Sequence, residues 1–276
     1  MWGKIRTLLY GFSQVMLQKN WLTGLLFLLG IAVNSIPLAV GALAGSFVGN
    51  LTAILMKCPK KEFEEGLYGY NAVLVGIAVF LFYGITPLSI IFLIIGAVLS
   101  TIILHIHPKQ SLPAYTAPFV LATWCIEAIG VAFGVRQVAG SGVLAQTDIL
   151  AAISNGFGQV MFQQNPTTGA LFFIGVLISS LLAGIFSLLA SAVGVIAPLV
   201  LNSDSNRTYA GIFAYNAVLC GIAFAGHKLG NIVKAATAVV LSISLVAAMI
   251  QFGIPALTAP FVIACWIVIL LRNLFK

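Results

Sequence analysis

The sequence predicts an all-α polytopic membrane protein, built from two inverted five-helix repeats with broken or re-entrant helices around a central pore. Three observations lead to this fold class: a very apolar composition, a succession of apolar runs, and the recurrence of three motifs in both halves of the chain. Hydrophobic residues make up 61% of the chain and charged residues only 7%, with a mean hydropathy of +1.12. Soluble globular domains carry about 25% charged residues, so the composition excludes that class.

Ten apolar runs follow one another with little polar sequence between them. About 20 apolar residues are needed to cross the hydrocarbon core of a bilayer, and we therefore predict ten crossings. In chain order the runs cover residues 21–35, 36–56, 66–83, 86–105, 116–134, 166–180, 181–201, 211–226, 230–250 and 258–272. Residues 1–18 lack the small-residue cleavage site of a signal peptide. We expect them to form an N-terminal half-helix of the mature chain.

The basic residues are distributed unevenly between the two sides of the predicted spans. With the N-terminus in the cytoplasm, eleven of the thirteen lysines and arginines fall on the cytoplasmic side, and only Arg136 and Arg207 fall outside. This pattern follows the positive-inside rule. We therefore predict a cell (inner) membrane protein with both termini in the cytoplasm. The net charge of +7 reports topology, and we expect no nucleic-acid partner.

Three motifs occur twice, in the same order. Nine of fourteen residues are identical between GFSQVMLQKNWLTG (11–24) and GFGQVMFQQNPTTG (156–169). Nine of thirteen are identical between GLYGYNAVLVGIA (66–78) and GIFAYNAVLCGIA (211–223), and again between LPAYTAPFVLATW (112–124) and IPALTAPFVIACW (254–266). The offset is 145 residues for the first two motifs and 142 for the third. One ancestral unit is therefore used twice.

The duplication divides the chain into a first repeat, residues 1–145, and a second repeat, residues 146–276. Because each repeat holds an odd number of predicted crossings, five, the second must be inverted relative to the first. Equivalent motifs would then approach the membrane midplane from opposite sides. A pathway that is open to two sides would need its lining twice.

The third motif places prolines within the apolar sequence of both repeats. They are Pro113 and Pro118, and Pro255 and Pro260. A proline removes a backbone donor and disrupts the preceding helical turn, and in lipid each freed carbonyl needs another partner. The prolines are therefore typical of the mouths of short or broken helices that face a pore. Alternatively they begin ordinary helices, because proline is favoured in the first turn.

The predicted spans contain few groups for catalysis or ion coupling. No Walker A, HExxH or GxSxG motif and no adjacent cysteine–histidine cluster is present, so we predict no catalytic residue, cofactor or metal and no enzyme. Glu127 is the one acidic residue within the runs, and we interpret it as a carboxylate at the membrane interface. Ion-coupled transporters usually carry several intramembrane ionisable groups. The sequence therefore favours passive transport.

The spans offer paired, uncharged side chains instead. The pairs are Gln14 with Gln159, Asn71 with Asn216, Thr116 with Thr258, Tyr70 with Tyr215, and Leu17 with Phe162. They supply hydrogen-bonding groups and apolar walls without fixed charge, which suits a small neutral polar solute. Alternatively, glutamine, asparagine and threonine hold transmembrane helices together, and the tyrosines are packing aromatics.

Four of these segments closely resemble the urea transporter family. They are L-P-x-x-T-x-P-F at 112–119, its copy at 254–261, G-L-x-G-Y-N-A-x-L-V-G at 66–76, and Q-x-x-x-Q-x-N-P-x-T-G at 159–169. The resemblance extends over residues 11–272 and is closest to a bacterial member, judged by chain length. It implies a homotrimer in the lipid bilayer, each protomer with its own continuous pore, that passes urea passively down its gradient.

The resemblance also implies roles for the paired residues. Thr116 and Thr258 would lie at the constriction in the middle of the pore, and Gln14 and Gln159 along its oxygen-rich side. Flat apolar slots on either side of the constriction would be formed by Tyr70, Tyr215, Leu17 and Phe162. The roles of Asn71 and Asn216 stay open between lining the pore and holding helices together.

The physical chemistry of urea agrees with such a lining. Urea is planar, with one carbonyl and two NH2 groups, and removing an amide-like group from water into a medium without hydrogen bonds costs roughly 4–8 kcal/mol. Oxygen acceptors along one wall can replace the lost water, as in other selectivity filters. The alternative is a channel for another small neutral solute, such as short amides, ammonia or water. A membrane enzyme or scaffold would need an acid–base or metal cluster, or long extensions, which the sequence lacks.

Overall fold

The computed structural model describes residues 2–108, 112–138 and 147–274, and all regular structure in these ranges is helical. The prediction of an all-α polytopic membrane protein is confirmed. The N-terminal half contains α1 (Trp2–Gln14), α2 (Trp21–Asn34), α3 (Ile36–Leu55), α4 (Lys60–Glu64), α5 (Tyr70–Tyr83), α6 (Pro87–Ile106) and α7 (Ala117–Ala132). The C-terminal half contains α8 (Ile149–Gly158), a 3-10 turn η1 (Gln159–Met161), α9 (Pro166–Ser179), α10 (Leu181–Val200), α11 (Ser205–Tyr209), α12 (Ala214–Ala223), α13 (Leu229–Gln251) and α14 (Ala259–Leu274).

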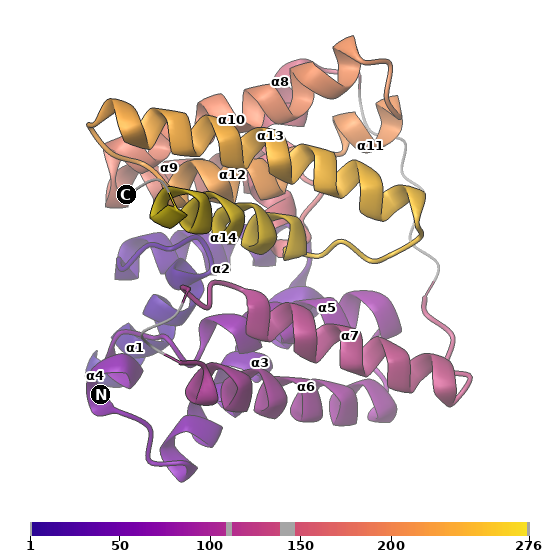
Figure 1. Cartoon of the computed structure of the whole chain (residues 1–276). Coiled ribbons are helices and arrows are strands. Elements are labelled where there is room, and N and C mark those ends of the chain that lie inside the picture. Colours follow the sequence, from indigo (N-terminus) through magenta and orange to yellow (C-terminus); the bar gives the residue numbers. More distant parts are fainter. Residues whose placement is uncertain (1, 109–111, 139–146, 275–276) are drawn as a thin grey trace. The chain divides into compact units, whose positions relative to one another are not determined.

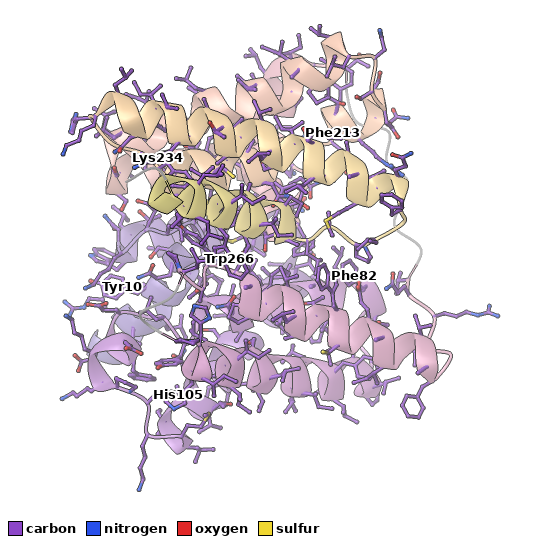
Figure 2. All side chains as sticks on the ribbon, viewed as in Figure 1. Tyr10, Phe82, His105, Phe213, Lys234 and Trp266 are labelled. Carbon is purple, nitrogen blue, oxygen red and sulfur yellow. The ribbon has the colours of Figure 1, made fainter. Side chains whose placement is uncertain are left out.

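The chain forms two compact units. The first comprises residues 1–109 and 114–142, and the second residues 110–113 and 143–276. Pro113 therefore belongs to the second unit, where its carbonyl accepts a hydrogen bond from Trp266 Nε1 of α14 at 2.8 Å. Figure 2 labels Trp266. Lys109 and the predicted repeat boundary between residues 145 and 146 lie outside the described residues. The inverted relation of the two repeats stays a prediction.

Each predicted apolar run contains one helix, but the helices differ in length. Within the described residues, four are long and apolar enough to cross a membrane on their own: α3, α6, α10 and α13. The remaining six helices, α2, α5, α7, α9, α12 and α14, are between 10 and 16 residues long. At about 1.5 Å per residue, they are shorter than a hydrocarbon core of about 30 Å.

Two serines separate the helices of consecutive apolar runs, 21–35 from 36–56 in the first unit and 166–180 from 181–201 in the second. Ser35 is extended (φ −156°), and its side chain accepts a hydrogen bond from Leu38 N at the start of α3. Ser180 is extended in the same way (φ −157°) and accepts from Ala183 N at the start of α10. An N-cap serine satisfies one of the donors that a helix start leaves unpaired. It thereby begins a new helix directly after α2 or α9.

The long helices present large apolar side chains on their outer faces. On α6, Ile90, Ile91, Ile94 and Ile95 are each between 44% and 52% exposed. Monomeric soluble proteins rarely expose contiguous apolar patches larger than a few hundred Å². These faces therefore fit contact with lipid. The buried side of α6 packs against α5 and α7, and the three helices are neighbours in the first unit (Figure 1).

Glycines allow the closest helix contacts in both units. A β-carbon on Gly24 of α2 would lie 1.9 Å from the carbonyl oxygen of Leu9 in α1, and one on Gly169 of α9 would lie 1.9 Å from that of Ser154 in α8. Both contacts involve backbone atoms, so no side-chain rotation can relieve them. Small residues that let backbones approach closely are common where membrane helices pack. The same contact is therefore built twice.

We predict that Gly24→Ala destabilises the protein strongly, because the new methyl group overlaps the backbone of α1. Overpacking of this kind typically destabilises by about 1–3 kcal/mol, occasionally more. Thermal unfolding of the detergent-purified protein measures the effect. Gly230→Ala in α13 is the matched control, since a β-carbon there meets nothing within 4 Å. Equal melting temperatures for Gly24→Ala and wild type would contradict the close approach of α1 and α2.

Candidate functional site

The first predicted pair of slot residues, Leu17 and Phe162, lies just beyond the ends of α1 and η1. Leu17 N bonds to Gln14 O (2.9 Å) and Gln18 N to Ser13 O (3.0 Å), which closes the helix with Leu17 in the left-handed region at φ 59°. Phe162 has φ 61° in the equivalent turn. Glycine usually occupies this position, and a side chain there is strained. The chain thus has large apolar side chains at two positions where the backbone conformation favours glycine.

The two predicted glutamines make the same hydrogen bond in both units. Gln14 Nε2 donates to Glu65 O at 3.1 Å, and Gln159 Nε2 donates to Ala210 O at 3.0 Å. Each acceptor carbonyl comes directly before a glycine with positive φ, Gly66 (75°) or Gly211 (82°). These bonds orient each amide and leave its Oε1 without a donor among the described residues.

The two predicted tyrosines hold the backbone next to the threonines. The hydroxyl of Tyr70 at the start of α5 donates to Tyr115 O, and the hydroxyl of Tyr215 in α12 donates to Leu257 O. Tyr115 and Leu257 both have φ 44°, so the tyrosine bond fixes a left-handed residue immediately before Thr116 or Thr258. The tyrosines are therefore anchors of this turn, and their role as walls of the slots stays a prediction.

The two predicted asparagines serve the helices that follow the threonines. Asn71 Oδ1 accepts from Phe119 N in the first turn of α7 at 3.1 Å, and Asn216 Oδ1 accepts from Phe261 N in the first turn of α14 at 3.0 Å. Helix starts leave such donors unpaired, so each asparagine caps a helix from another element. Holding helices together is the role that the structure gives to Asn71 and Asn216.

The remaining donors of these first turns are also satisfied without the threonine side chains. Ala117 N bonds to Ala114 O and Ala259 N to Ala256 O, both at 3.0 Å. The next residue is Pro118 or Pro260, which has no N–H. Pro118 and Pro260 therefore lie in the first turns of short helices, whereas Pro113 and Pro255 precede these helices. That the helix starts face a pore stays a prediction.

Thr116 and Thr258 consequently keep free hydroxyls. Thr116 is the N-cap of α7, yet its side chain makes no capping hydrogen bond. The two threonines are 0% and 2% exposed, and neither Oγ1 has a partner among the described residues. A buried polar group without a partner costs about 1–3 kcal/mol. The same unpaired hydroxyl therefore occurs at the equivalent position of both units.

Each unit thus joins a tyrosine, an asparagine and a threonine into one cluster at a helix start. No hydrogen bond among the described residues links the glutamine of either unit to its threonine. The sequence could not reveal the carbonyls of Tyr115 and Leu257, because the two side chains differ and only their backbones act alike. Glu127 is 9% exposed within α7, so it packs against the protein, and its place at the membrane interface stays a prediction.

A helical membrane protein with two copies of an uncharged polar cluster fits the class of solute transport proteins. Comparison with known proteins agrees. A family model described as urea transporter matches residues 5–273. The proteins named urea transporter 1 from Ovis aries and Capra hircus are each 29% identical to this chain, over 97% of this chain and 78% of their own length. Urea transporter 1 from Rattus norvegicus is 31% identical, over 79% of this chain and 62% of its own length. The chain belongs to the urea transporter family, and it is a transporter rather than an enzyme.

We predict that Asn71→Ala weakens the start of α7, because it removes the buried acceptor of Phe119 N–H. The expected loss is about 1–3 kcal/mol of stability, with faster amide hydrogen exchange in the first turn of α7. Asn206→Ala, at an exposed position of α11, is the control and should exchange and melt like wild type. Unchanged exchange at the start of α7 would show that Asn71 does not cap this helix.

Proposed function

We propose that this protein passes urea down its gradient along a pathway to which each unit contributes one threonine hydroxyl, one glutamine amide oxygen and apolar walls. Thr116 and Gln14 serve the first unit, and Thr258 and Gln159 the second. The walls are formed by Leu17, Phe162, Tyr70 and Tyr215. The single observation that supports this most is the pair of buried threonine hydroxyls without partners.

Such a hydroxyl matches the needs of urea in transit. The hydroxyl can accept a hydrogen bond from an NH2 group of urea or donate one to its carbonyl. Urea breaks no hydrogen bond within the protein when it binds, because no described protein group is bonded to the threonine oxygen. A hydrogen bond of this kind contributes about 1 kcal/mol net. Two modest interactions lower the desolvation barrier without holding the solute, which a fast passive route requires.

The absence of charge from the cluster accounts for exclusion of ions. Thr, Gln, Tyr and Asn carry no counter-charge, and the few oxygens proposed for the pathway would replace only part of the hydration shell of an ion, so its desolvation would be poorly compensated. A flat neutral solute loses much less. Selection would thus rest on shape and hydrogen bonding.

The assembly and membrane placement follow the same proposal. A homotrimer with one pore per protomer is what the family resemblance implies, and the excess of basic residues on one side of the predicted spans supports cytoplasmic termini in a cell (inner) membrane. Analytical ultracentrifugation of the detergent-solubilised protein tests the first statement. Protease or cysteine accessibility at the N-terminus of the cellular protein tests the second.

We predict that Thr116→Val and Thr258→Val each reduce urea flux about fivefold, the effect of about 1 kcal/mol on a barrier, while folding is unchanged. Valine has the shape of threonine but lacks the hydroxyl. Stopped-flow light scattering of proteoliposomes in a urea gradient measures the flux, and gradients of methylurea and formamide measure selectivity.

Thr237→Val is the matched control. Thr237 is exposed on α13, and its hydroxyl bonds to Val233 O of the same helix at 2.9 Å, so this variant should carry urea like wild type. Full flux in the double variant of Thr116 and Thr258 would exclude the hydroxyls from the pathway. Higher flux for formamide than for urea in the wild type would favour a different solute.

A further inference from the structure

A cavity of about 650 Å³ lies in the first unit, lined by residues of α1, α3 and α4. None of the residues proposed for urea transport lines it. Its apolar wall includes Phe47, Leu51 and Ile54 of α3 and Phe63 of α4. Its polar residues include Arg6, Asn50, Lys60 and Glu64. The cavity therefore combines a hydrophobic surface with basic groups.

The cavity lies at the end of a helix long enough to cross the membrane. Leu51 and Ile54 belong to the last turns of α3, and Lys60 follows after a loop of four residues, 56–59. The end of such a helix lies at the level of the lipid head groups. With α3 as a membrane span, which its length and composition allow, the basic groups of the cavity would be near the depth of the phospholipid phosphates.

An apolar stripe on α3 leads along the helix to this cavity. Its members recur every three or four residues and are therefore on one face. They are Val40, Leu43, Phe47, Leu51 and Ile54, between 38% and 65% exposed. A stripe of this kind can accompany an acyl chain from the bilayer core to the cavity.

The basic side chains are not committed to strong partners in the protein. The Arg6 guanidinium lies over the ring of Tyr10, 5.7 Å from its centre, and no carboxylate among the described residues pairs with it; Figure 2 shows Tyr10. Lys60 Nζ is 3.8 Å from Glu64 Oε1, but the two side chains are 87% and 60% exposed. Exposed pairs of this kind contribute little. Both cations can therefore turn to an anionic ligand.

Asn50 adds a hydrogen-bond acceptor. Its Nδ2 donates to Ser46 O at 2.8 Å, whereas its Oδ1 is buried and has no partner among the described residues. A hydroxyl group of a ligand could donate to this oxygen. Two basic groups and one free acceptor match a phosphate that carries a hydroxylated head group.

The second unit does not repeat this arrangement. At an offset of 145, Arg6, Lys60 and Asn50 correspond to Ala151, Ser205 and Val195. The transport cluster is kept in both units, while these polar groups are present in one. The duplicated pathway therefore does not account for these polar groups.

We propose that this cavity binds an anionic phospholipid with a hydroxylated head group, of the phosphatidylglycerol class. Its phosphate lies between Arg6 and Lys60, its head-group hydroxyl donates to Asn50 Oδ1, and one acyl chain follows the stripe on α3. Charge complementarity and the adjoining apolar stripe favour this occupant over a soluble anion, because a soluble anion would gain nothing from the apolar wall. They also favour it over a second copy of this chain, because two basic faces repel each other.

Native mass spectrometry of the full chain in detergent, titrated with phosphatidylglycerol and with phosphatidylcholine, tests the proposal. We predict preferential binding of phosphatidylglycerol, weakened about fivefold by Arg6→Gln and about fivefold by Lys60→Gln, as expected for basic residues near an anionic lipid. Lys61→Gln is the matched control, since Lys61 is exposed, carries the same charge and does not line the cavity.

Each other outcome overturns the proposal. An equal loss in Lys61→Gln would indicate bulk electrostatic attraction only, and equal binding of phosphatidylcholine would remove the role of the charges. Competition by inorganic phosphate at lipid-saturating conditions would indicate a soluble-anion site. A change of oligomeric mass in the Arg6 and Lys60 variants, without lipid preference, would assign the face to contacts between copies. Urea flux, measured in parallel, tests the transport proposal separately.

Discussion

The structure depends on how the backbone donors at the start of α7 and α14 are satisfied. A threonine at a helix start normally caps the helix with its hydroxyl. Here the third N–H is taken by an asparagine from α5 or α12, and the second residue is a proline that has none. The hydroxyl therefore has no structural task. The proline and the asparagine together remove the need for a threonine cap, so the threonine hydroxyl is available to bind a solute.

The anchoring of this turn explains why bulky residues tolerate strained backbone conformations next to it. Tyr115 and Leu257 have positive φ, and each carbonyl accepts from a buried tyrosine hydroxyl. Strained residues persist only where their surroundings fix them. Leu17 and Phe162 are held similarly by the hydrogen bonds that close α1 and η1. Backbone geometry is thus conserved between the two units even where side chains differ.

The sequence could predict the helical class, the duplicated motifs and the pairing of Thr116 with Thr258, because apolar content and identical residues are read directly from it. It could not show that Asn71 caps α7 or that Tyr70 holds Tyr115, since these bonds join residues 48 and 45 positions apart. Ten apolar runs could be found, including the boundaries at Ser35 and Ser180, but hydropathy does not show where each helix begins and ends within its run, and six of the ten helices are only 10 to 16 residues long. The burial of Glu127 against the protein could not be predicted, because hydropathy does not indicate which face of α7 packs inward.

Neutral residues around the threonines are repeated in both halves of the chain, whereas several charged residues occur in only one half. The residues repeated around each threonine are neutral, which suits a route that must not bind ions or hold its solute. Charged residues such as Arg6, Lys60 and Glu64 have uncharged counterparts, Ala151, Ser205 and Tyr209, at the same offset. If the repeats are inverted, these counterparts face the opposite leaflet, where the positive-inside rule requires fewer basic residues. One ancestral unit would then keep its neutral interior in both copies while each outer end adapts to its own lipid surface.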